Sequence, residues 1–272
     1  MIKISISVVC FNSPIKQLKD LTDSIIAAVR FMRQRAEVGS IPFYFIDNSE
    51  LATFSISELQ GDFDELSVQT KLINGHGNIG YGSAHNLVLD EIASDYHLIL
   101  NPDVILEEDA LHQAITLLMS EPKRKMLGPS AVGEKGERQY LCKRYPSIST
   151  LLLRGILPNP LRHLFEKRLN YYEMRDLPED RVTDDIPLLS GCFILIDTPT
   201  LKKVGGFDSG YFLYFEDFDL SLRVKKIGTL AYAPMVRITH AGGQASTKGL
   251  RHILMFSLSA LRFFGNHGWR VF

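Results

Sequence analysis

The chain has 272 residues, enough for one large domain or two small ones with a substantial core. Hydrophobic residues make up 45% and charged residues 22%, as in ordinary soluble globular proteins. The formal net charge of -1 gives no electrostatic basis for nucleic-acid binding, so we expect no nucleic-acid partner. The cysteines are scattered without CxxC spacing, which argues against a zinc site or a disulfide framework; they are Cys10, Cys142 and Cys192.

The sequence carries no targeting or membrane-spanning signal. It enters a strand pattern at once, with no basic region followed by an apolar stretch, so we expect no signal peptide. No segment approaches 18 uninterrupted apolar residues, the length that a spanning helix needs. These observations predict a cytoplasmic protein.

Strand and helix patterns alternate through the first 120 residues. The β-branched run at residues 4–10 predicts a strand, and Ser13-Pro14 then opens a helix whose apolar residues recur at steps of three and four up to Met32. Further strands are predicted at 42–46, 68–73 and 97–100, and further helices at 83–92 and 107–120. The alternation predicts an α/β fold with a Rossmann-like, mostly parallel central sheet flanked by helices.

Small polar residues end all four predicted strands: Asn12, Asp47, Asn78 and Asp103. The carboxyl ends of parallel strands line one crevice, so these residues predict a nucleotide site there. Asp103 follows a strand that Pro102 must end, because proline cannot donate a ladder hydrogen bond. The alternative is that Asn101-Pro102-Asp103 is only a turn, since all three residues are turn formers.

The middle of the chain differs in composition from the first 120 residues. Residues 140–170 combine basic and apolar side chains, and prolines and Gly155 break any long helix. The segment is typical of an irregular subdomain with a solvated basic face, and the alternative is a cradle for an anionic lipid head group. Residues 173–185 are acidic and are predicted to form a mobile linker.

The last third contains strands, short helices and a long final helix. Residues 188–196 predict a buried strand, in which Gly191 indicates a bulge or a close approach of backbone to ligand. A short helix is predicted at 197–204, strands at 229–233 and 235–239, and a final helix at 248–264. That helix is expected to dock on the core, and lying on a membrane surface is the alternative.

Three carboxylates open a predicted helix directly after an aromatic run: Glu216, Asp217 and Asp219. Helix capping needs one acid, whereas three acids among aromatic rings repel one another, and such crowding raises a carboxyl pKa toward the working range of a general base. His240 follows the last strand beside a glycine turn. A lone histidine is usually structural, but one at a strand end is also a candidate metal ligand.

One competing motif points to another class of enzyme. Residues 75–80 fit GxGxxG between a strand and a helix, with Asp103 about where a ribose-binding acid belongs, as in NAD(P)-dependent enzymes. The match follows the third strand and not the first, and it leaves Asp47, the acidic cluster and His240 without a function. A non-catalytic glycan- or lipid-binding protein is a further alternative, against which the intact acidic cluster argues.

A series of motifs resembles a known family. In order they are Asp47-Asn48, Asn78-x-Gly80-Tyr81-Gly82-x-x-x-Asn86, Leu100-Asn101-Pro102-Asp103, Ser190-Gly191-x-Phe193, Gly205-Gly206-Phe207-Asp208, Phe212-x-Tyr214-x-Glu216-Asp217-x-Asp219-Leu220-x-x-Arg223 and His240. The series is similar to the inverting GT-A glycosyltransferases of the family 2 type, above all to the bacterial rhamnosyltransferases of O-antigen, lipopolysaccharide and cell-wall polysaccharide assembly. The resemblance covers roughly residues 4–246.

The resemblance implies an activity and its partners. The donor would be a nucleotide sugar, dTDP-L-rhamnose above all, and the cofactor a divalent Mg or Mn ion. The acceptor would be a saccharide, often a lipid-linked GlcNAc. We therefore expect an inverting transferase that contacts the inner face of the cytoplasmic membrane from the cytoplasm.

The resemblance also implies residue roles. Asp47 would bind the base and Asn12 would lie near the nucleoside, while the remaining donor-binding positions would be Asn78, Gly80, Gly82, Asn86, Asn101, Asp103 and Gly191. Asp103 would be the metal-binding acid, His240 a second metal ligand, and Asp217 the general base beside Glu216. The motif that holds Asp103 has one carboxylate where the family pattern has two, which makes a weaker site for a hard cation. The expected organisation is a nucleotide-sugar half at 1–105, an acceptor and catalytic half at 106–246, and a C-terminal helix at 247–272.

Overall fold

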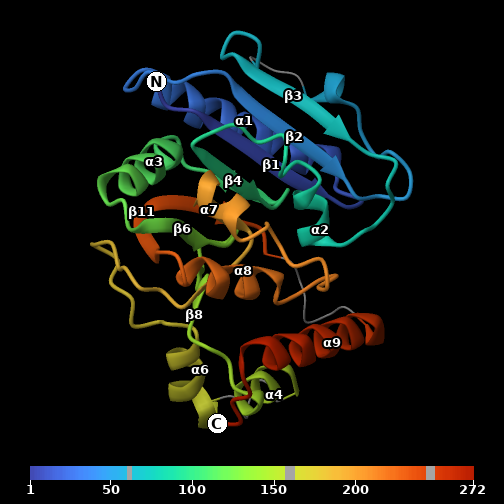
Figure 1. Ribbon diagram of the computed structural model, residues 1–272, viewed down its shortest axis with the longest axis vertical. Coiled ribbons are helices and arrows are strands. Elements are labelled where there is room, and N and C mark those ends of the chain that lie inside the picture. The colour runs from blue at the N-terminus through green and yellow to red at the C-terminus, as the bar shows by residue number, and fades with distance from the viewer. Residues whose placement is uncertain (60–62, 157–162, 243–248) are drawn as a thin grey trace.

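The fold is that of a computed structural model, which describes residues 1–59, 63–156, 163–242 and 249–272 (Figure 1). Its strands are β1 (Ile4–Cys10), β2 (Ile41–Asp47), β3 (Val68–Ile73), β4 (Tyr96–Leu100), β5 (Val104–Leu106), β6 (Arg124–Val132), β7 (Arg138–Gln139), β8 (Cys142–Lys143), β9 (Leu188–Leu189), β10 (Phe193–Asp197) and β11 (Thr229–His240). Its helices are α1 (Ile15–Arg33), α2 (Tyr81–Asn86), α3 (Ala110–Ser120), α4 (Ile148–Ile156), α6 (Glu166–Tyr172), α7 (Thr198–Lys203), α8 (Glu216–Lys225) and α9 (Leu250–His267).

One large sheet carries the fold, in the order β3-β2-β1-β4-β10-β6-β11-β5. The apolar stripe of α1 is buried as its spacing predicts, and α1 and α3 cover one face of the sheet. Helices α2, α7 and α8 cover the other face, where Ala84, Leu201 and Leu220 join a second hydrophobic cluster (Figure 1). Both faces are therefore buried, which explains why every residue of β1 is buried.

The expected α/β sheet is confirmed, and its pairing is more mixed than the alternating pattern predicted. Strands β3, β2, β1 and β4 are parallel, but β10 runs antiparallel between β4 and β6, and β5 runs antiparallel to β11. Strands β5 and β6 were not predicted. The boundary expected at residue 105 falls inside β5, and the sheet continues across it.

Several predicted elements have other bounds than their patterns indicated. The strand expected at 188–196 is two strands, β9 and β10, separated by a turn at Ser190 to Cys192. The two strands expected at 229–239 are one, β11, whose register against β6 shifts between Ala233 and Arg237. Pro234 lies in that shift, where a residue without an N–H can be accommodated. The helix expected at 83–92 begins at Tyr81 and ends at Asn86, with turns following.

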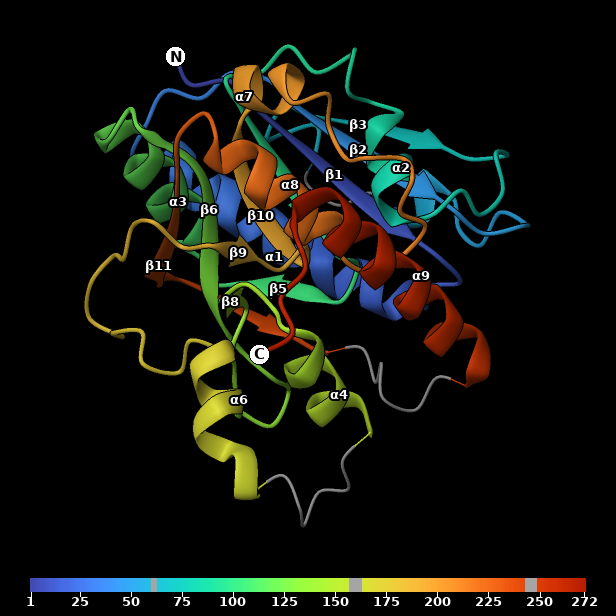
Figure 2. The same cartoon turned by 60° about the horizontal axis from the view of Figure 1, so that its bottom comes forward.

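A small helical region below the sheet contains α4 and α6, as Figure 2 shows from another side. It corresponds to the predicted irregular subdomain, except that 157–162 lie outside the described residues. The segment 173–185 has no helix or regular strand, but it is not free of the sheet. Thr183 bridges to Tyr232, and Asp184 pairs with Arg124 at 2.6 Å, so these contacts hold the predicted linker against the domain.

Helix α9 docks on this region and on α8, as expected. Phe263 and Phe264 are buried against Phe215 and Tyr145. After α9, the carbonyls of Arg270 and Val271 accept backbone hydrogen bonds from the start of α4, and Figure 2 shows the C-terminus beside that helix. The predicted first residue of the helix, Lys248, lies outside the described residues. Among the residues described, no helix has the length and apolarity that would let it cross a membrane.

Candidate active site

Strand pairing brings three distant segments to one edge of the sheet. Leu100 at the end of β4 pairs with Phe193 at the start of β10, and the N–H of Asn101 donates to Cys192 O at 2.9 Å. On the other side, His240 at the end of β11 pairs with Val104. The Asn101-Pro102-Asp103 turn therefore lies between the start of β10 and the end of β11, which explains how Asp103 and His240, 137 positions apart, can share a site.

Asp103 in this turn and His240 at the end of β11 face each other. Asp103 Oδ1 lies 3.4 Å from His240 Nε2, and both atoms are buried without a hydrogen-bond partner in the described part of the chain. Buried polar atoms are nearly always partnered, so two orphaned atoms that meet are a ligand-binding geometry. A carboxylate oxygen and an imidazole nitrogen suit a divalent cation. Within the described residues no third histidine, cysteine or acid joins them, so a cation here would need ligands from its substrate or from water.

Gln139 on β7 fixes the orientation of the His240 ring, and sequence reasoning missed it. Gln139 Oε1 lies 2.7 Å from His240 Nδ1, and Gln139 Nε2 donates to His240 O at 2.8 Å. When Nδ1 carries the proton and donates to the amide oxygen, Nε2 keeps its lone pair toward Asp103. A two-residue strand with no recognisable motif gives no sequence signal for such a residue.

Asp217, the predicted general base, lies in the first turn of α8, and two backbone donors hold its carboxylate. Gly191 N–H donates to Oδ2 and Phe218 N–H donates to Oδ1, each at 2.9 Å. Burial raises the pKa of Asp217 above its ordinary value, although these hydrogen bonds act in the opposite direction. Burial and the neighbouring Asp217 raise the pKa of Glu216. The predicted crowding of acids is therefore present, and it favours a carboxylate that holds its proton more strongly than usual.

The third acid of the predicted cluster has another role. Asp219 is buried and accepts from Arg223 Nε at 2.7 Å, and its other oxygen lies 2.7 Å from His267 Nε2. It therefore connects α8 to the end of α9 and does not face the site. Directly before α8, Tyr214 and Phe215 have φ values of 73° and 65°, a conformation that is rare for bulky residues and that occurs at functional sites.

The predicted donor residues at the ends of β1 and β2 form a separate, connected group. Asp47 is fully buried, and its oxygens accept from Ser49 N and from the N–H and hydroxyl of Thr53. It shapes the loop after β2 in this structure, and its predicted contact with a base stays a prediction. Asn12 is exposed beside this loop, with its N–H donating to Ser49 Oγ at 2.8 Å.

Residues of the motif that contains Asn78 hold neighbouring segments of the chain together. Asn78 Oδ1 accepts from Gly80 N at 3.1 Å. A side chain on Gly80 would lie 2.4 Å from Phe212 O, and one on Gly82 would lie 2.7 Å from Phe207 Cβ. Asn86 donates to Phe207 O and accepts from Phe207 N. The two glycines and Asn86 thus hold the 207–212 segment against α2, and their expected role in donor binding stays a prediction.

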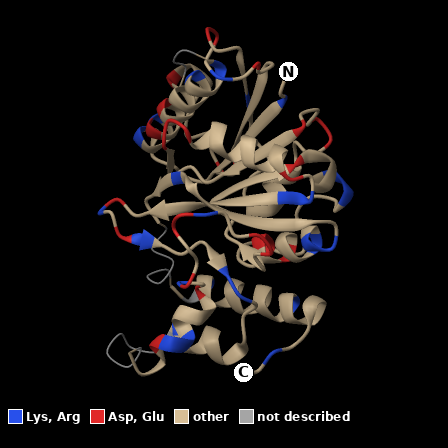
Figure 3. Cartoon of the chain, turned by 90° about the vertical axis from the view of Figure 1, so that its left-hand side faces the viewer, with Lys and Arg blue, Asp and Glu red and all other residues tan. Residues whose placement is uncertain are grey.

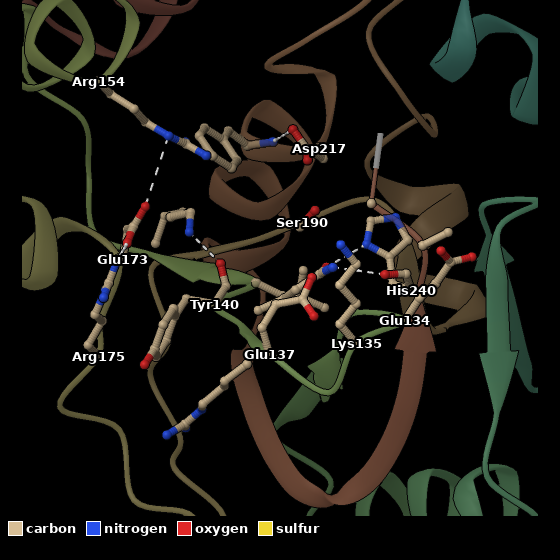
Figure 4. A pocket seen from close by; sticks show the side chains of 17 residues that line it. Glu134, Lys135, Glu137, Tyr140, Arg154, Glu173, Arg175, Ser190, Asp217 and His240 are labelled. Atoms are coloured by element: carbon tan, nitrogen blue, oxygen red, sulfur yellow. Dashed lines mark hydrogen bonds and ion pairs between the residues drawn. The ribbon is translucent and has the colours of Figure 1, made fainter. Parts of the chain in front are cut away.

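A cavity of about 920 Å³ opens beside Asp217 and His240, and its volume is within the usual range for ligand sites (Figure 4). Asp217, His240 and Ser190 line it, and Gly191 lies behind Asp217. The structure therefore brings together Asp103, Gly191, Asp217 and His240 from four segments. Asp47 and Asn12 do not line this cavity.

Sequence comparison relates the chain to rhamnosyltransferases. It is 27% identical over 185 residues to N-acetylglucosaminyl-diphospho-decaprenol L-rhamnosyltransferase of Mycobacterium tuberculosis, which covers 62% of this chain and 58% of that protein. It is 27% identical over 177 residues to rhamnosyltransferase WbbL of Escherichia coli K12, which covers 60% of this chain and 61% of that protein. The chain thus matches about six tenths of the length of these relatives. No protein-family model matches it.

Solved glycosyltransferase structures share the fold over nearly the whole chain. GalNAc-T7 with UDP, GalNAc and Mn²⁺ matches with a TM-score of 0.61 at 14% identity, over 97% of this chain and 48% of that one. TarS 1–349 of S. aureus with UDP gives 0.58 at 14% identity over 97% and 66%. The mannosyltransferase PcManGT of Pyrobaculum calidifontis, with GDP-Man and Mn²⁺, gives 0.58 at 14% identity over 96% and 64%. The GT-A fold and the resemblance to rhamnosyltransferases are both confirmed.

Proposed function

We propose that the chain is an inverting glycosyltransferase that moves a rhamnosyl group from dTDP-L-rhamnose to a lipid-linked GlcNAc in surface polysaccharide synthesis. One observation carries the proposal: a single cavity is lined by Asp217, a carboxylate with a raised pKa, and by His240, which faces Asp103. A proton acceptor and a pair of cation ligands at one cavity suit transfer from a nucleotide sugar, because one takes the proton of the acceptor and the other can neutralise the leaving diphosphate. The named relatives support rhamnose as the sugar and a diphospholipid acceptor.

Asp217 would act as the general base. An acceptor hydroxyl is a poor nucleophile, so its proton must leave as its oxygen bonds to the anomeric carbon and the nucleoside diphosphate departs. The hydrogen bonds from Gly191 and Phe218 hold the carboxylate in place, and each oxygen still has a second lone pair that can accept a proton. A single displacement inverts the anomeric centre and needs no covalent intermediate on the protein.

Asp103 and His240 would hold a divalent Mg or Mn ion, together with oxygens of the donor diphosphate. Such an ion, when bound, neutralises the negative charge that grows on the leaving phosphate. The orphaned Oδ1 and Nε2 fit this role, and two of the fold neighbours were solved with Mn²⁺. Because the protein supplies one carboxylate, we expect weak ion affinity without the donor.

The nucleoside would bind beside the ends of β1 and β2, near Asn12 and Asp47. Asn48 supports this arrangement, because its side chain donates to Asn78 Oδ1 and to Gly80 O and so joins the two loops. The NAD(P) alternative is less well supported. Its glycine loop follows β3 at the outer edge of the sheet, and Gly80 in that loop is packed against Phe212.

The outer side of α9 would contact the membrane that holds the acceptor. Four exposed apolar residues recur there at helical spacing: Ile253, Leu254, Leu258 and Leu261. Exposed basic residues, Arg251 and Arg270, lie on and just after the helix, and Figure 3 shows this helical region as mostly uncharged. An apolar helix face with neighbouring cations suits the surface of an anionic bilayer.

The test is transfer by the purified protein. With dTDP-rhamnose, Mg²⁺ or Mn²⁺ and a GlcNAc-diphospho-lipid, it should release dTDP and form a rhamnosylated lipid. Asp217→Asn should reduce turnover by at least a thousandfold while donor binding changes little, and exposed Asp23→Asn on α1 is the matched control. A variant Asp217→Asn with full activity would contradict the assignment of the base. Binding of the acceptor without any donor turnover would favour the non-catalytic alternative.

A further inference from the structure

One end of the cavity carries a concentration of positive charge. Lys143 on β8, Arg154 on α4 and Arg175 line it, and we call these three residues the basic wall. In Figure 4, Arg154 and Arg175 lie on the side away from His240, with Asp217 and Ser190 between. The side chains of Arg154 and Arg175 are 52% and 42% exposed, so a molecule in the cavity can reach both.

The basic wall has more positive charge than its acidic partner can neutralise. Glu173 lies between the two arginines: Arg175 Nη2 donates to it at 2.7 Å, and Arg154 Nε is 4.0 Å away (Figure 4). Asp217 is a second anion close to Lys143, so three cations against two acids still leave one positive charge over. Arg138 has a separate partner in Glu179, and the acids Glu134 and Glu137 lie with Lys135 nearer His240.

Without a bound anion, the surplus of positive charge is energetically unfavourable, chiefly because Lys143 is buried. Its side chain is only 7% exposed, and its Nζ donates to Tyr140 O, a neutral acceptor. Burial, and then the charge of Arg154, lower its pKa to about 8. A buried ammonium ion beside other cations is unfavourable unless an anion completes the site. This arrangement is typical of a phosphate-binding surface, for which arginine supplies paired N–H donors.

We propose that the basic wall binds the diphosphate of the acceptor, and so selects a diphospholipid-linked sugar over a neutral glycoside. This inference rests on the proposed function. Asp217 lies between the wall and the Asp103–His240 pair, so the acceptor sugar would lie at Asp217 with its own diphosphate toward the wall. The donor diphosphate would lie at the opposite end, beside Asp103 and His240.

Two soluble acceptors test the proposal: GlcNAc-diphospho-alkyl, and the neutral GlcNAc-O-alkyl with the same chain. The wild-type protein should have a KM at least tenfold lower for the diphospho compound. Arg154→Gln and Arg175→Gln should each raise the KM for the diphospho compound by about tenfold to a hundredfold, with little change in donor KM. Arg154→Lys and Arg175→Lys, which keep the charge, should recover part of the loss. Arg181→Gln removes an exposed arginine that does not line the cavity and is the matched control.

Glu173→Gln separates binding from support of the fold. It breaks the same ion pairs as the arginine substitutions but leaves the wall more positive, so it should keep or strengthen affinity for the diphospho compound. If the wall were only a structural ion-pair cluster, Glu173→Gln and Arg175→Gln would weaken that affinity alike. Such a result, or equal KM values for the two acceptors in the wild type, would overturn the proposal.

A binding measurement distinguishes this inference from the proposed function. Calorimetric titration of GlcNAc-diphospho-alkyl in EDTA, without donor, needs neither the cation nor transfer. If Arg154→Gln weakens this binding about tenfold, the result supports the proposed role of the basic wall, even if the protein transfers no sugar. If neither arginine substitution affects transfer to the diphospho compound, the proposed role of the basic wall is wrong and the proposed function is unaffected.

Discussion

The backbone N–H of Gly191 donates to Oδ2 of Asp217 at 2.9 Å, across 26 residues of sequence. A side chain at Gly191 would lie 3.3 Å from Asp217 Cβ and 3.4 Å from the ring of Tyr81. Glycine therefore allows the start of β10 to approach α8 closely enough to hold the carboxylate. The predicted close approach of backbone at Gly191 is present, and its partner is a side chain of the protein.

The raised pKa of Asp217 predicts the acid limb of the pH profile. The base must be ionised, so kcat/KM should rise with pH through the pKa of Asp217, with a midpoint above the ordinary value of about 3.9 for aspartate. Glu216 should still be protonated in that range, since its pKa is raised further. Glu216→Gln should therefore keep most of the activity at pH 6. An acid limb at or below pH 4 in the wild type would contradict this prediction.

Removal of the Gln139 side-chain amide should weaken cation binding. Gln139→Leu deletes the acceptor that holds His240 Nδ1, so the ring is no longer fixed with Nε2 toward Asp103. Loss of such a supporting contact typically lowers metal affinity by about tenfold to a hundredfold. The Mn²⁺ concentration for half-maximal activity should increase by that factor, whereas exposed Gln69→Leu on β3 should leave it unchanged. Equal Mn²⁺ dependence in both variants would show that Gln139 has no part in the site.

The parts of the site that the sequence could predict are those that end strands. Asp103 and His240 follow runs whose apolar pattern marks them as buried strands, and the sheet then brings their ends together. Glu216 and Asp217 were recognisable because acids crowd among aromatic residues. Asp219 belongs to the same acidic cluster, but its contacts with Arg223 and His267 direct its carboxylate away from the site. Because His267 is distant in sequence, the local pattern could not reveal this contact.

The parts that could not be predicted depend on tertiary pairing. Strand β6 contains Gly128 and Pro129, which obscure its pattern, and it exists because β10 and β11 lie on either side. Gly80 was expected among the donor-binding residues, which stays a prediction, and its φ of 90° and its contact with Phe212 show a packing requirement that the motif did not reveal. Glycine motifs indicate close approach, but the approaching partner is decided by the fold.

Two buried histidines predict how stability depends on pH. His97 lies between Ser5 and Ser7, and His85 bonds to Ser7. Burial lowers the pKa of His97 to about 3, below the unfolded value of about 6.5. The unfolded chain therefore binds a proton below pH 6.5 that the folded protein does not, so this contribution to stability is complete above pH 6.5 and is lost as pH falls toward 3.

The measurement is the difference in unfolding free energy between wild type and His97→Gln. That difference should decrease by about 1.4 kcal/mol per pH unit between pH 6 and 4. Glu216 and Asp217 have raised pKa values and act in the opposite direction, because their stability contribution is lost as pH rises. They are common to both proteins and cancel. A difference that does not vary with pH would mean that His97 is protonated in the folded state.

The outer face of α9 predicts binding to anionic vesicles. Leu254 and Leu258 are 60% and 57% exposed, and insertion of such side chains into the lipid interface contributes on the order of 1 kcal/mol each. The double substitution Leu254→Asp and Leu258→Asp should therefore lower the vesicle partition coefficient by at least tenfold. Turnover of a soluble short-chain acceptor should stay within about twofold, because neither residue lines the cavity.

Leu51→Asp is the control, since Leu51 is 82% exposed in a loop of the other half of the chain. Co-sedimentation with vesicles that contain 30% anionic lipid, at about 0.05 and 0.5 M salt, separates the electrostatic contribution to vesicle binding from the apolar contribution. Screening at high salt should remove the attraction due to Arg251 and Arg270 and leave the apolar contribution. If the double variant and Leu51→Asp sediment equally with vesicles, α9 does not contact the bilayer.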